Sequence, residues 1–187
     1  MHNDIAKEVA SILKSYAPSK PEVTAKALRK LWLGYAPNRG MDLIKAEQRE
    51  QLEAIGIPAP ILKAIGKEIA RTARKDVGGF VPLAQQLWDR HGREGHVVAL
   101  VMFGAMELVE PERVVPILKD LCKRCVSWED ADRLAMDALE PVVRKYPDKW
   151  LSVIAAWLND PNKWVRRASI IVIGRLPMRH PAYVKQC

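Results

Sequence analysis

The chain has 187 residues, of which 49% are hydrophobic and 28% are charged, and it contains only 10 glycines. This composition excludes a disordered or collagen-like chain and leaves enough apolar material for a large core. The formal net charge of +8 favours a polyanionic partner, of which nucleic acid is the first candidate.

The N-terminal segment, MHNDIAKEVASIL, carries early charge and lacks the uninterrupted apolar core of a signal peptide. Charged residues interrupt every apolar run before it reaches the length of a membrane span. Three cysteines, an odd number, fit a reducing compartment better than a disulfide framework. We therefore predict a cytoplasmic protein with no membrane partner.

Apolar residues recur at spacings of three and four along the whole chain, which predicts helices throughout and no strand. Short breaks separate segments of helix length at Pro18–Pro21, Pro37–Gly40, Gly56–Pro60, Gly78–Gly79, Gly92–Gly95, Pro111, Ser127, Pro147 and Pro161. Connections as short as these join antiparallel neighbours.

Residues 94–109 and 164–176 are apolar on almost every side, so we expect both helices to be covered on two sides. Inner helices of an α-solenoid have this property, and helix pairs of about 40 residues have the HEAT period. We predict an all-α fold, an α-solenoid of HEAT-like antiparallel helix pairs forming one domain over residues 1–187. A globular helical bundle is the alternative.

Cys122 and Cys125 form a CxxC motif without a second pair, and both share an apolar arc with Leu118 and Leu121. We predict packed core thiols, with a redox module as a minor alternative. The histidines have no ligand spacing, so we predict no metal and no cofactor; they are His2, His91, His96 and His180. Four tryptophans are expected to fill the core, namely Trp32, Trp88, Trp150 and Trp157.

Ser127 and Asp130 form a capping box, which predicts that a helix begins here. Trp128 falls on the apolar arc of this helix, and Asp132 lies inside that arc, whereas the other acids lie elsewhere or belong to the cap. A partly desolvated carboxylate requires a partner or a chemical task. One interpretation is a structural ion pair that orients a neighbouring arginine, and the other is catalysis.

Asp160 is a suitable N-cap and Pro161 a suitable first helical residue, which would place Arg166 and Arg167 in the opening turns of a helix. Cations there oppose the helix dipole, whereas a bound anion would be stabilised by the free amides and the guanidinium groups. A phosphate site explains the pattern, and pairing with acids of adjacent repeats is the alternative.

These residues carry a resemblance. The SWEDAD segment followed by WVRRA resembles the bacterial DNA alkylation repair glycosylases of the AlkD type, which consist of HEAT-like repeats. Residues 56–70, GIPAPILKAIGKEIA, and residues 83–100, LAQQLWDRHGREGHVVAL, are also similar to that family. The similarity extends over most of residues 40–176.

The resemblance implies a DNA glycosylase that excises cationic alkylated purines, of the 3-methyladenine and 7-methylguanine type, from duplex DNA. Asp132 matches the catalytic aspartate, Trp128 its aromatic partner and Arg167 the active-site arginine, with Arg166 as the alternative if the register differs. The expected DNA-binding residues are Arg166, Lys163, Trp164, Arg93, Lys123 and Arg124. A monomer is expected.

One departure from the family stands out. The family's pocket includes a further aromatic residue from a later helix, for which Tyr183 is a poor substitute by position. Three interpretations of this departure stay open: a C-terminally truncated form, a shorter relative and an inactive paralogue. The rival function is a non-catalytic basic HEAT-like scaffold that binds DNA, RNA or an acidic protein.

Overall fold

The computed structural model describes residues 2–36 and 55–183, and these residues contain helices but no strand, which confirms the all-α prediction. The chain divides into two compact units, residues 1–103 and 104–187. The prediction of one domain over residues 1–187 stays a prediction. None of the described helices is long and apolar enough to cross a membrane.

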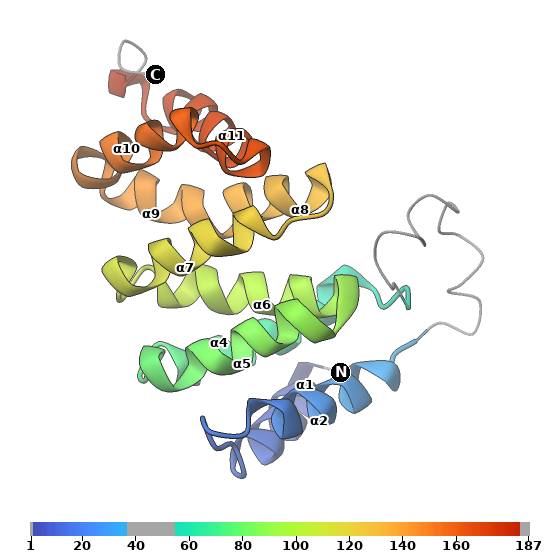
Figure 1. The fold of residues 1–187 in the computed structure, drawn as a ribbon. Coiled ribbons are helices and arrows are strands. Elements are labelled where there is room, and N and C mark those ends of the chain that lie inside the picture. The colour runs from blue at the N-terminus through green and yellow to red at the C-terminus, as the bar shows by residue number, and fades with distance from the viewer. Residues whose placement is uncertain (1, 37–54, 184–187) are drawn as a thin grey trace. The chain divides into compact units, whose positions relative to one another are not determined.

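The first unit contains α1 (His2–Leu13), α2 (Pro21–Leu33), α4 (Ala59–Ala73), α5 (Val77–Arg90) and most of α6 (Gly92–Met106). Helix α1 packs on α2 and α4, and α5 packs on α2 and α4 (Figure 1). The predicted break at Gly78–Gly79 is displaced, because α5 begins at Val77 and the Asp76 carboxylate caps it by accepting from the amide of Gly79 at 2.9 Å.

The second unit begins with the end of α6 and continues with α7 (Pro111–Lys123), α8 (Trp128–Arg133), the π-helix η1 (Leu134–Leu139) and α9 (Glu140–Lys145). It ends with α10 (Pro147–Ala155), the 3-10 turn η2 (Ala156–Asn159), α11 (Lys163–Arg179) and the 3-10 turn η3 (Pro181–Tyr183). Helix α11 contacts every helix from α7 to α10. Helix α10 packs on its chain neighbours α9 and α11, which agrees with HEAT-like helix pairs.

The core contains the residues that helical periodicity predicts. All four tryptophans assigned to packing are at most 6% exposed: Trp32, Trp88, Trp150 and Trp157. Helix α6 is buried along most of its length, as expected of an all-apolar segment. Helix α11 differs, because Ile170 is 61% and Met178 is 78% exposed. The expectation that residues 164–176 are covered on two sides is therefore wrong.

Candidate active site

The capping residues of α8 place Trp128 and Asp132 one helical turn apart. The Ser127 hydroxyl accepts a hydrogen bond from the amide of Asp130 at 3.2 Å, which confirms the predicted cap. The return contact differs from that of a capping box, because Ser127 Oγ donates to Asp130 Oδ2 at 2.9 Å. Since residues four apart share a helix face, the indole and the carboxylate project from neighbouring points of α8.

A π-helix follows Asp132 almost directly, and the sequence analysis missed it. Pro141 has no amide hydrogen to donate to the carbonyl of Asp137, so this carbonyl lacks the hydrogen bond of a regular α-helix. The helix widens into η1 instead, and the Asp137 carbonyl approaches α6 at Gly104, where a Cβ would lie only 2.5 Å from the oxygen. Single π-turns inside helices are frequent at functional sites.

The carboxylate of Asp132 is held by the guanidinium of Arg167 from α11. Arg167 donates from Nε to Oδ1 at 2.5 Å and from Nη2 to Oδ2 at 2.9 Å, a parallel two-bond fork between residues 35 positions apart. The Asp132 side chain is 18% exposed and that of Arg167 is 43% exposed, so the pair lies at the surface. The hydrogen bonds that Arg167 donates to Asp132 raise the pKa of Arg167 above its ordinary value, which keeps the guanidinium charged.

The ion pair that one interpretation of Asp132 predicted is present, and its partner is Arg167, one of the two arginines that the phosphate interpretation assigned to an anion. The two roles are compatible. Arg167 has five N–H donors and uses two on Asp132, and each carboxylate oxygen accepts one bond from Arg167 and keeps a second lone pair.

The indole of Trp128 is 60% exposed. The rest of the apolar arc differs, since Ala131, Leu134 and Leu139 are fully buried. The difference arises because Trp128 is the first residue of α8, where the helix end leaves one side uncovered. A large apolar ring at the surface, one turn from a carboxylate, is available for stacking on a ligand.

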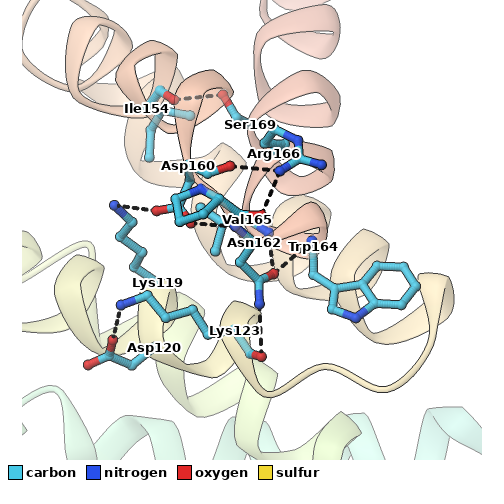
Figure 2. A network of polar contacts seen from close by, with 11 residues as sticks. Lys119, Asp120, Lys123, Ile154, Asp160, Asn162, Trp164, Val165, Arg166 and Ser169 are labelled. Carbon is cyan, nitrogen blue, oxygen red and sulfur yellow. Dashed lines mark hydrogen bonds and ion pairs between the residues drawn. The ribbon is translucent and has the colours of Figure 1, made fainter.

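The start of α11 differs from the sequence prediction. The N-cap is Asn162, not Asp160: its Oδ1 accepts from the amides of Trp164 and Val165 at 2.8 and 3.3 Å (Figure 2). Asp160 instead accepts from the amide of Asn162 at 2.9 Å and pairs with Lys119 at 3.0 Å. Asp160 therefore stabilises the turn before α11 and links it to α7, and Asn162 caps the helix.

Lys119 was not among the predicted residues. Its ammonium group also lies 5.4 Å from the centre of the Trp157 ring, so it joins α7 to the η2–α11 connection by an ion pair and a cation–π contact. Nothing in the sequence signals that Lys119 joins these two elements, because the periodicity of its helix predicts only which apolar residues are buried.

The predicted DNA-binding residues of the second unit cluster at the end of α7 and the start of α11. The Asn162 side chain donates to the carbonyl of Lys123 at 3.2 Å, which joins these two helix ends (Figure 2). Lys123 pairs with Asp120 at 3.0 Å, and the next residue, Arg124, is exposed. Lys163 lies over the Trp164 ring at 4.5 Å.

Arg166 is less available than predicted. Its Nη1 donates to the carbonyls of Asp160 and Pro161, both at 2.8 Å, so this side chain fastens the loop before α11 (Figure 2). Arg93 belongs to the first unit, where it lies partly buried in the first turn of α6. Tyr183 donates its hydroxyl to Asp148 Oδ1 at 2.7 Å.

The CxxC cysteines are buried, which confirms the core interpretation. Burial raises the pKa of the Cys122 thiol to about 12 and also raises that of Cys125, so neither is an activated nucleophile. Residues 2–36 and 55–183 contain no group of three or more His, Cys, Asp or Glu side chains that could hold a metal ion.

These observations define a class. Helix pairs, a net charge of +8 and a surface carboxylate–guanidinium pair beside an exposed indole suit a helical protein that acts on a polyanion bearing aromatic rings, such as nucleic acid.

The family can be named more closely. Residues 37–176 match the family model of the DNA alkylation repair enzymes, and the chain belongs to this family. Membership supports a role in the repair of alkylated DNA. Comparison with curated proteins and with solved structures finds no match.

Proposed function

We propose that this protein is a DNA glycosylase of the AlkD type, which excises cationic alkylated purines such as 3-methyladenine and 7-methylguanine from duplex DNA. It hydrolyses the N-glycosidic bond. The observation that carries the proposal is the surface fork between Asp132 and Arg167, one helical turn from the exposed Trp128.

The reaction requires few catalytic groups from the protein. Alkylation at N3 or N7 gives the purine a positive charge, so the base leaves as a neutral molecule and no general acid is required. What remains is to stabilise the positive charge that develops on the sugar and to position a water molecule. One carboxylate can perform both tasks.

Asp132 is that carboxylate in the proposed mechanism. The fork fixes its orientation, and the lone pair that each oxygen keeps is available to the developing oxocarbenium ion and to the attacking water. Rigid placement matters because electrostatic stabilisation is effective only when the charge is oriented before the reaction.

Arg167 and Trp128 bind the damaged nucleotide. The remaining N–H donors of Arg167 would contact the phosphate next to the lesion, as a guanidinium can serve two anions at once. The exposed face of Trp128 would lie against the cationic base, an interaction of about 0.5–2 kcal/mol. The predicted cytoplasmic location and monomeric state stay predictions.

The test is release of 7-methylguanine or 3-methyladenine from methylated duplex DNA under single-turnover conditions. Asp132→Asn is expected to lower the rate by at least about 10²–10³-fold, the usual effect of removing one preorganised electrostatic group. Asp137→Asn is the matched control, since it removes an exposed carboxylate from the same continuous helix and is expected to leave the rate unchanged.

Two outcomes oppose the proposal. Absence of base release by the purified wild-type protein, combined with salt-dependent binding to duplex DNA, would favour the non-catalytic scaffold. Equal rates for Asp132→Asn and Asp137→Asn would show that the fork has only a structural role.

A further inference from the structure

A second feature of the molecule lies in the first unit, on helix α4. Three cations of α4 follow one another at four-residue spacing, Lys63, Lys67 and Arg71, and all three are exposed. They line a hollow of about 650 Å³. The other lining residues are Ala6 of α1 and Ala59, Pro60, Ala64 and Glu68 of α4, and we call this set the α4 groove.

The α4 groove is positively charged. Among the described residues of its lining Glu68 is the only acid, and its Oε2 accepts from Arg71 Nη1 at 2.6 Å, so the three cations and one anion leave a net charge of +2 (3 − 1). Among the residues that the structure describes, neither Lys63 nor Lys67 has an ion-pair partner.

Neighbouring acids of the described residues lie outside the lining: Glu94 of α6 is buried and accepts from the amides of the three residues 55–57 before α4. Asp4 and Glu8 of α1 stand two residues before and after Ala6, which puts them on nearly the opposite face of that helix. The first turn of α4 contains no acidic residue and has no side-chain cap, so the positive end of its dipole also lies at the groove.

The groove is open because α4 packs with its other face. Ile65 and Ile69 are fully buried, and Gly66 lies so close to Val101 of α6 that a Cβ would stand 2.8 Å from the valine Cβ. The cations therefore project along one side of a firmly anchored helix.

The arrangement fits a chain of phosphates better than a single small anion. Residues four apart on a helix are separated by about 6 Å along its axis, so the three cations extend over about 12 Å in a line and do not converge on one point. The remaining walls are alanine and proline side chains, which offer no donor or acceptor for reading a base edge.

We propose that the α4 groove binds the phosphate backbone of duplex DNA without regard to sequence or damage, and so anchors undamaged and alkylated DNA alike. The inference deepens the proposed function and rests on it for the choice of polyanion, but it concerns binding and not base release. Backbone contacts of this kind supply most of the non-specific affinity of a DNA-binding protein.

The experiment measures binding of the full-length protein to an undamaged duplex by fluorescence anisotropy over a range of salt concentrations. Each phosphate contact contributes about 0.9 to the slope of log K against log salt. Lys63→Gln/Lys67→Gln is expected to reduce the slope by about 1.8 and to weaken binding roughly 10- to 60-fold at about 0.1 M salt. Lys14→Gln/Lys20→Gln removes two exposed lysines outside the groove and is expected to change the slope by less than about 0.5.

The outcomes separate the two proposals. The expected slope change in a protein that releases no base would support the α4 groove and end the glycosylase proposal. Equal slopes for the two double variants, with equal circular dichroism and melting temperature, would overturn the groove, as would no binding by the wild type. A further experiment titrates the protein with inorganic phosphate. If Lys63→Gln/Lys67→Gln abolishes tight phosphate binding but leaves duplex binding unchanged, the groove binds a small phosphate and the inference is overturned.

Discussion

The contact between Gly104 and the π-helix gives a quantitative prediction. In Gly104→Ala, the new Cβ would lie 2.5 Å from the carbonyl oxygen of Asp137, about 0.8 Å inside the closest ordinary C···O contact of about 3.3 Å. Overpacking costs about 1–3 kcal/mol, and the upper end applies because backbone meets backbone and no flexible side chain can move away. Alanine recovers about 1 kcal/mol of helix propensity, so the net loss is about 2 kcal/mol.

Gly174→Ala is the matched control. A Cβ at Gly174 in α11 would meet nothing within 4 Å, so the same substitution is expected to raise the free energy of unfolding by up to about 1 kcal/mol. Urea unfolding monitored by circular dichroism measures the free energy of unfolding of both variants. Because Asp132 lies only two residues before η1 begins at Leu134, base release should also fall in Gly104→Ala and not in Gly174→Ala. A Gly104→Ala protein as stable as Gly174→Ala would refute the reasoning.

Three further predictions concern buried polar groups. Burial raises the pKa of Glu107 well above 4.5, so the native protein keeps a proton that the unfolded chain releases, and stability falls as the pH rises above that value. Glu107→Gln should therefore melt at a higher temperature than the wild type at about pH 7 and at the same temperature at about pH 3; parallel pH profiles would contradict this. The thiols of Cys122 and Cys125 should react with Ellman's reagent no faster than the protein unfolds, and rapid labelling of either, located by mass spectrometry, would show an open site. Glu94→Ala should lower the free energy of unfolding by roughly 2–4 kcal/mol, because the buried Oε1 of Glu94 accepts from three successive amides before α4 at 2.8, 2.9 and 3.4 Å; a loss under about 1 kcal/mol would mean that these amides find other partners.

The sequence by itself determined the features that depend on local pattern. The helical class follows from apolar spacing, and the burial of Trp32, Trp150 and Cys122 follows from their place in that spacing. The cap at Ser127 follows from a contact between residues three apart. Such features are predictable because a helix fixes which near neighbours share a face.

Only the tertiary structure decided the features on which the site depends. The partner of Asp132 is 35 residues away, and the exposure of Trp128 depends on what covers the end of its helix. Asp160 was the cap predicted for α11, but Asn162 caps the helix and Asp160 pairs with Lys119 of another helix. Periodicity states which side chains share a face, but the exposure and charge partners of that face are set by elements distant in sequence, whose placement depends on packing.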